Sequence, residues 1–109
     1  MSDMNVLIEQ IVAEISMQAF QLEDLRLRLF LNWLMDHSSQ MKISLGGVNT
    51  GFRSMDRQAC FQAALKTWFG SLPSQGLLWE YRIVIDEIGW WRDLDSLRLK
   101  MIVGSDVEE

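Results

Sequence analysis

The chain of 109 residues is too short for two independent hydrophobic cores, so we expect one domain over residues 1–109. Hydrophobic residues make up 49% of it and only one residue is proline, which excludes disorder for most of the chain. The single cysteine, Cys60, excludes an internal disulfide, and no apolar run approaches the ~20 residues of a membrane span. We therefore expect a cytoplasmic protein that does not enter the membrane.

The net charge of −5 is distributed unevenly along the chain. Residues 1–40 contain six acidic and two basic residues, residues 41–70 one acidic and four basic, and residues 71–109 eight acidic and four basic. The overall negative charge argues against direct binding of nucleic acid. The alternation of sign leaves two interpretations open: the segments pair with one another across the fold, or the basic middle segment faces an anion.

The first third of the chain predicts two helices. Between Met4 and Phe20, apolar residues recur every three or four positions, as on one face of an amphipathic helix. Between Leu22 and Met35, apolar residues cover nearly the whole circumference, so this helix is central in the core or covered by another chain. We favour two helices packed as a hairpin; the alternative is one continuous helix from Met4 to Asp36 that dimerises.

The middle third predicts a strand, a turn and a third helix. Residues 41–45 alternate apolar and polar side chains, which is the period of a strand. Three glycines and an asparagine in residues 46–51 predict a turn. Ser54 is a suitable N-cap for a helix from Met55 to Phe69, whose inward side would carry Ala59, Phe61, Ala64, Leu65 and Trp68, and Gly70 is placed to end that helix.

The last third predicts an antiparallel β-hairpin. Apolar and polar residues alternate from Trp79 to Asp86 and again from Ser96 to Val103, on either side of a loop at residues 87–95. Part of the segment also fits a helical spacing, which leaves a helix as the alternative, and residues 104–109 form a frayed acidic tail. The predicted fold class is α+β, with two N-terminal helices, a short strand, a third helix and a C-terminal β-hairpin, the helices packing on one face of a small antiparallel sheet.

No set of residues supports catalysis or metal binding. Cys60 and His37 are the only members of their types, and Cys60 lies within an apolar helical segment where a small buried side chain is expected. One cysteine and one histidine do not complete a zinc site. The acidic group near residue 90 lacks the spacing of a calcium loop and has arginines beside it. We therefore predict no enzymatic activity, no cofactor and no metal.

Trp90 and Trp91 are the strongest candidates for a binding surface. They follow Gly89 in the predicted loop, where two adjacent side chains seldom both turn inward, so at least one should be exposed or covered by a partner. The predicted partner-binding residues are these two tryptophans and the carboxylates around them: Trp90, Trp91, Asp86, Glu87 and Asp93. The alternative is that both tryptophans close one end of the core.

These residues predict a non-enzymatic protein–protein interaction module, namely a small acidic cytoplasmic adaptor or inhibitor. Its partner would be a protein with a basic surface, bound in a salt-sensitive manner, and the chain itself would form a homodimer. The alternative function is binding of a small anion such as phosphate or a nucleotide. Free amides at a helix start and two guanidinium groups would hold the anion, and the residues involved are Gly46, Gly47, Gly51, Arg53 and Arg57.

Overall fold

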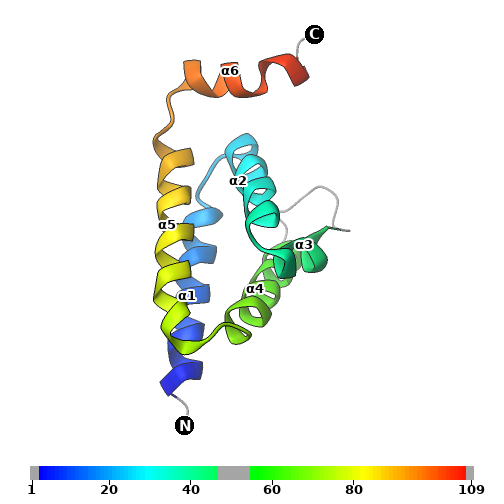
Figure 1. Cartoon of the computed structure of the whole chain (residues 1–109). Coiled ribbons are helices and arrows are strands. Elements are labelled where there is room, and N and C mark those ends of the chain that lie inside the picture. Colours follow the sequence, from blue (N-terminus) through cyan, green and yellow to red (C-terminus); the bar gives the residue numbers. More distant parts are fainter. Residues whose placement is uncertain (1–2, 47–54, 108–109) are drawn as a thin grey trace.

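The computed structural model describes residues 3–46 and 55–107, and every regular element in them is a helix. In chain order the elements are α1 (Asp3–Ala19), α2 (Asp24–His37), α3 (Ser39–Leu45), α4 (Met55–Gly70), the single 3-10 turn η1 (Ser74–Gly76), α5 (Leu77–Asp93) and α6 (Ser96–Val107) (Figure 1). The predicted α+β class is therefore wrong, because neither the short strand nor the C-terminal hairpin is present in the described residues. The chain is a small all-helical bundle.

The first two predicted helices are confirmed as α1 and α2, with a turn between them. The amide of Leu22 donates to the carbonyl of Ala19 at 3.1 Å, and the Glu23 carboxylate accepts from the amide of Leu25 at 3.1 Å, which caps the start of α2. A continuous helix to Asp36 is thereby excluded. The two helices do not form the expected packed hairpin, however, since α1 packs mainly on α4 and α5, whereas α2 packs mainly on α3 and α5.

The predicted strand at residues 41–45 is helix α3. Ser38 is buried between two helices: its amide donates to the carbonyl of Leu34 at 3.0 Å, and its hydroxyl accepts from the amide of Met41 at 3.2 Å. One serine therefore ends α2 and begins α3. The strand prediction placed Met41, Ile43 and Leu45 on one face, but only Met41 and Leu45, four residues apart, are buried, and Ile43 is exposed.

The third predicted helix is confirmed as α4. Its inward residues Phe61, Leu65 and Trp68 are buried as expected, whereas Ala59 is exposed. A hydrogen bond of 3.0 Å from Gln62 Nε2 to Ser16 Oγ joins α4 to α1, and the ring of Phe61 meets that of Phe20 edge-on at 5.4 Å.

The predicted C-terminal hairpin is two helices, α5 and α6. The buried residues of α5 (Leu77, Val84, Ile88, Trp91) follow a helical spacing, while Trp79, which the alternating pattern placed on the inward side, is 67% exposed. The predicted loop at residues 87–95 is reduced to Leu94 and Asp95. The Asp95 carboxylate accepts from the amide of Arg98 at 2.8 Å and caps the start of α6. Helix α6 continues to Val107, past the expected start of the tail at Gly104.

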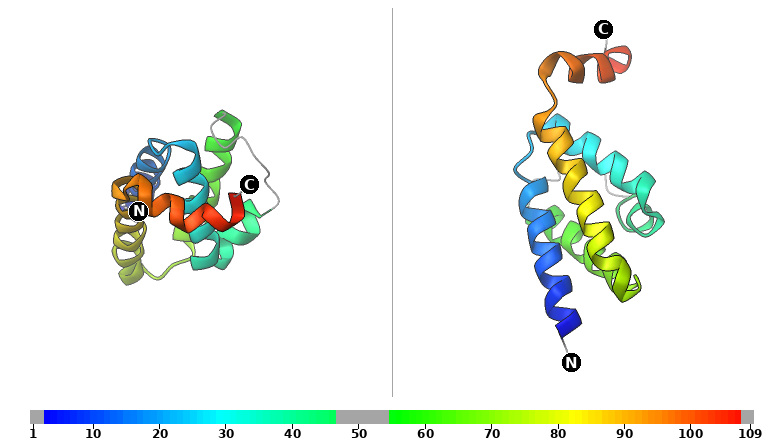
Figure 2. Two further views of the ribbon diagram at one scale, coloured as in Figure 1. Left: turned by 90° about the horizontal axis from the view of Figure 1, so that it is seen from above. Right: turned by 60° about the vertical axis from the view of Figure 1, so that its left-hand side comes forward.

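Helices α1 and α5 lie side by side and run in the same direction (Figures 1 and 2). Helix α4 packs against α1, α2 packs against α5, and α3 packs against α2 and α4. The core of these five helices contains the largest fully buried side chains: Phe30, Phe61, Phe69, Ile15, Leu31 and Leu34. Helix α6 turns across the end of the molecule opposite the N-terminus, and no other described helix packs along it. The radius of gyration of 14.5 Å accordingly exceeds the ~13 Å expected for a compact chain of this length.

Candidate protein-binding groove

The two adjacent tryptophans of α5 point to opposite environments. Successive residues of a helix are rotated by about 100°, so neighbours cannot share one face. Trp91 turns into the bundle and is 7% exposed, whereas Trp90 turns outward and is 49% exposed. Their rings meet edge-on at 4.8 Å. The prediction that at least one tryptophan would be exposed is confirmed, although the reason is the rotation of a helix and not the geometry of a loop.

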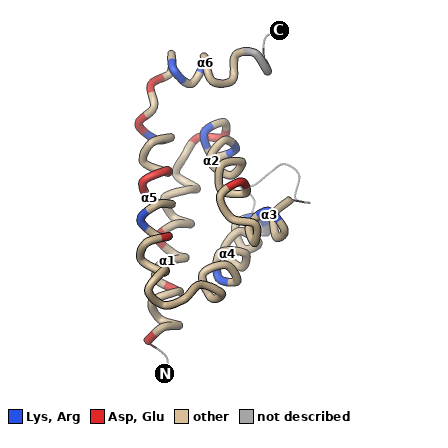
Figure 3. The backbone as a smooth tube through the Cα atoms, in the orientation of Figure 1, with Lys and Arg blue, Asp and Glu red and all other residues tan. Residues whose placement is uncertain are grey.

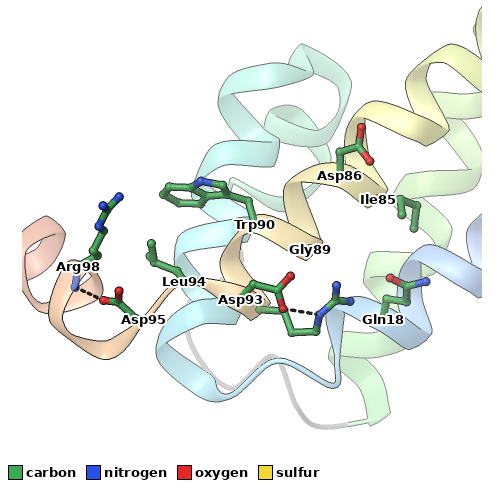
Figure 4. Close-up of a pocket in the computed structure, with 10 residues that line it drawn as sticks. Gln18, Ile85, Asp86, Gly89, Trp90, Asp93, Leu94, Asp95 and Arg98 are labelled. Carbon is green, nitrogen blue, oxygen red and sulfur yellow. Dashed lines mark hydrogen bonds and ion pairs between the residues drawn. The ribbon is translucent and has the colours of Figure 1, made fainter.

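An open hollow of about 810 Å³ lies along the outer face of α5, where α5 meets α6 and the end of α1 (Figure 4). We call it the α5 groove. Its lining residues come from these three helices and the short connection between α5 and α6: Gln18, Ile85, Asp86, Gly89, Trp90, Arg92, Asp93, Leu94, Asp95 and Arg98. Gly89 lies in the middle of this set with no side chain, so the surface is hollow between Ile85 and Asp93.

The rim of the α5 groove carries both signs of charge, with acidic residues in excess. Figure 3 shows that residues of both signs occur along α5. Asp93 Oδ1 lies 3.2 Å from Arg92 Nε, and Asp95 caps α6 through the amide of Arg98. Asp86 forms no ion pair with any residue in the part of the chain that the structure describes. The groove thus offers an exposed aromatic ring, an apolar centre and a carboxylate free to meet a cation.

The opposite face of α5 carries a polar cluster that packs against α2. Glu80 Oε1 lies 2.8 Å from Nε2 of His37, and the imidazole of His37 stacks on Trp33 at 4.8 Å and meets Trp68 edge-on at 6.0 Å. Burial raises the pKa of Glu87, while the indole N–H of Trp91 and the imidazole of His37 pull it the other way. This cluster connects α2, α4 and α5 and faces away from the groove.

Arg26 of α2 fixes the end of α5 from which the groove and α6 extend. Its Nη1 atom donates to the carbonyl of Leu94 at 2.6 Å and also to that of Trp91, the carbonyls that a helix end leaves without intrahelical partners. Its Nε donates to Glu23 Oε2 at 3.0 Å. Glu23, which caps the start of α2, therefore also contacts the arginine that binds the end of α5, and these contacts lie at the junction from which α6 leaves the body.

The structure divides the five predicted partner-binding residues between the two faces of α5. Asp86, Trp90 and Asp93 line the α5 groove, and Trp90 is its largest side chain. Glu87 and Trp91 belong instead to the inward face. Sequence reasoning missed Gly89, Leu94 and Arg98 as groove residues because it assigned them to a loop and a strand.

Two other sequence hypotheses concern different parts of the molecule. Of the predicted anion-binding residues, Gly47, Gly51 and Arg53 lie outside the described residues, Gly46 follows the end of α3, and Arg57 is half-buried in the first turn of α4. Anion binding therefore stays a prediction. Cys60 is half-buried on α4, and His37 is engaged by Glu80. The described residues contain no group of three or more histidine, cysteine or acidic side chains that could hold a metal ion.

Comparisons of the chain with models of known protein families, with curated proteins and with solved structures returned no match. None of the described helices combines the length and the apolar character needed to cross a membrane. A function for this chain has to be argued from the geometry of its own surface.

Proposed function

We propose that the chain is a non-enzymatic protein–protein interaction module of the cytoplasm, a small acidic adaptor or inhibitor, and that it holds its partner in the α5 groove. The observation that carries this proposal is the hollow at Gly89, flanked by the exposed ring of Trp90 and the carboxylates of Asp86 and Asp93.

Gly89 supports a binding role because its position is unfavourable for the helix itself. A glycine inside a helix costs about 1 kcal/mol relative to alanine. The bundle does not require a glycine there, since an added Cβ would meet only Nη2 of Arg92, the far end of a flexible side chain, at 3.3 Å. What the glycine provides is space on the surface. A residue that lowers stability and opens a groove is expected where another molecule has to approach the backbone.

The chemistry of the groove indicates the kind of partner segment that fits. A half-exposed tryptophan beside an apolar hollow is typical of the anchor residues that dominate protein interfaces. Asp86 and Asp93 at the rim favour basic residues on the partner and would steer its approach. The partner should therefore present an apolar side chain or strip with lysine or arginine next to it.

A photo-reactive aromatic residue placed at position 90, in the cells from which the chain comes, tests this proposal. Trp79 provides the matched control, because it is an exposed tryptophan on the same helix outside the groove. We expect a discrete protein adduct from position 90 and none from position 79. Asp86→Lys combined with Asp93→Lys should remove the adduct, and added salt should weaken it.

Gly89→Leu separates loss of binding from loss of folding. The leucine raises helix propensity, so the free energy of unfolding should increase by roughly 0.8 kcal/mol, while the side chain fills the groove and lowers the adduct yield about tenfold. Equal adducts from positions 79 and 90, or an undiminished adduct in Gly89→Leu, would contradict the proposal.

A further inference from the structure

Helix α6 presents an apolar strip that the rest of the chain leaves uncovered. Leu97 and Met101 are four residues apart, hence on one side of the helix, and they are 70% and 74% exposed. By the 100° rotation per residue, Arg98 lies on one flank of this strip and Lys100 on the other, and both are exposed. Only Leu99, on the far side of α6, is buried among its side chains that the structure describes.

The α5 groove has the complementary pattern. Its floor is the bare backbone at Gly89, and its walls include Ile85 and Trp90. Its rim carries three carboxylates and two guanidinium groups, from Asp86, Asp93, Asp95, Arg92 and Arg98, so acidic residues are in excess. The apolar strip of α6 and its two flanking cations therefore suit a hollow that has apolar side chains at its centre and an excess of carboxylates at its rim. Helix α6 therefore has the combination of apolar and basic side chains that suits the groove.

Helix α6 of the same chain does not lie in its own groove. Only Leu94 and Asp95 separate α5 from α6, and Asp95 and Arg98 at the start of α6 form one end of the groove. From that end α6 turns away across the end of the molecule, over the side where α2 lies (Figures 1 and 2). Another copy of α6 is free to enter.

We propose that the α5 groove receives α6 of a second copy of this chain, and that the chain forms a symmetric dimer by this reciprocal exchange. The groove and α6 lie at the same end of the molecule, so one two-fold axis through that end brings α6 of each copy to the groove of the other. The inference rests on the proposed function, because it names an occupant for the same groove. A foreign partner would have to compete with α6 by presenting a similar segment.

Reversing the charges on each side of the contact tests the exchange by sedimentation equilibrium. One variant carries Arg98→Glu and Lys100→Glu on α6, and the other carries Asp86→Arg and Asp93→Arg in the groove. Each variant alone places like charges together at both contacts, so we expect self-association to weaken at least about tenfold relative to the native chain. In a 1:1 mixture both contacts regain opposite charges, so a heterodimer of native affinity should form.

Matched controls change the net charge by the same amount elsewhere. Lys42→Glu with Lys66→Glu corresponds to the α6 variant, and Glu9→Arg with Asp36→Arg corresponds to the groove variant; all four residues are exposed and none lines the groove. Both controls should dimerise like the native chain, and circular dichroism should show that every variant is folded.

Three results would overturn the exchange: a native chain that is monomeric up to about 1 mM, a dimer that persists in either charge-reversed variant, or a mixture that stays monomeric. If a foreign protein is still cross-linked at position 90 in any of these cases, the groove remains a partner site and only the exchange is wrong. If no adduct forms either, the proposed function is wrong as well.

Discussion

The body of the molecule, helices α1 to α5, and its last helix, α6, differ in how far their apolar side chains are buried. In helices α1 to α5 most large aliphatic and aromatic residues pack against one another, and Phe30, Phe61 and Phe69 are fully buried, although Trp79 and Trp90 of α5 are exposed. In α6, which is similarly rich in leucine, methionine and isoleucine, Leu97 and Met101 face solvent. The difference teaches that composition alone does not decide burial: Leu99 is the one described side chain of α6 in the core, and the strip of Leu97 and Met101 is left exposed to solvent.

Truncation of a core side chain should lower the free energy of unfolding more than any other substitution considered, and it tests most directly which region stabilises the fold. Phe30 is fully buried and its ring stacks on Trp33 at a centroid distance of 6.0 Å. Phe30→Ala removes this packing and leaves a cavity, so we expect the free energy of unfolding in urea to fall by about 3–5 kcal/mol. Met101→Ala, the matched deletion on α6, should change it by less than about 0.5 kcal/mol. A comparable loss in both variants would mean that α6 belongs to the core.

Loss of the Arg26 side chain should lower the free energy of unfolding by an intermediate amount, because this residue binds the end of α5 where the body of the molecule meets α6. Its side chain is largely buried and donates to carbonyls at the end of α5. Arg26→Met keeps most of the aliphatic volume but leaves those carbonyls without donors, which should cost about 2 kcal/mol. Arg28→Met, an exposed arginine on the same helix, is the control and should have little effect.

The same variant tests whether Arg26 directs α6. Hydrogen exchange at the amides of α6 should accelerate in Arg26→Met more than exchange in α4, because the lost contacts lie at the junction from which α6 leaves. Uniform acceleration along the chain would show that Arg26 contributes to global stability and does not position α6.

The N-terminal helices and α4 could be predicted from the sequence because their apolar residues keep a helical period over three or more turns. The two errors in secondary structure fell on segments in which short alternation fits a strand as well as a helix. At residues 41–45 the capping serine Ser38 favours a helix over a strand. At residues 79–93 the buried side chains are those that face α1 and α2, and Trp79 is exposed, a distribution that depends on tertiary packing and not on the local sequence. The carboxylate of Asp95, three residues before Arg98, was the sequence signal for α6.

The candidate site could be predicted only in part, for a related reason. The cluster of charge around Trp90 and Trp91 is visible in the sequence, and three of its five residues line the groove. The five residues are divided between two faces of α5 because successive residues of a helix are rotated by about 100°. The prediction of a β-hairpin could not anticipate this division. The contribution of Gln18 from α1 depends on the packing of α1 beside α5, since 67 residues separate Gln18 from Ile85 in the chain.

The smallest expected change in stability is that of a substitution at Glu87, and it tests whether this residue lies on the inward face of α5 or in the groove. Burial raises the pKa of Glu87, so the folded chain binds this proton more tightly than the unfolded chain does. Just above the ordinary glutamate pKa, the unfolded chain therefore loses the proton first, and stability falls as the pH rises through the folded pKa. Glu87→Gln removes this dependence and should be slightly more stable than the native chain at pH 7, with the difference shrinking towards pH 4.

Urea unfolding between pH 4 and 7.5 measures this difference, with Glu9→Gln, an exposed glutamate of α1, as the control for removing one negative charge. Because Glu87 faces α2 and not the groove, the same substitution should leave the adduct at position 90 unchanged. Loss of the adduct in Glu87→Gln would show that Glu87 belongs to the binding surface, as the sequence analysis predicted. A stability difference that grows towards low pH would contradict the burial of the Glu87 carboxylate and, with it, the assignment of this face of α5 to the interior.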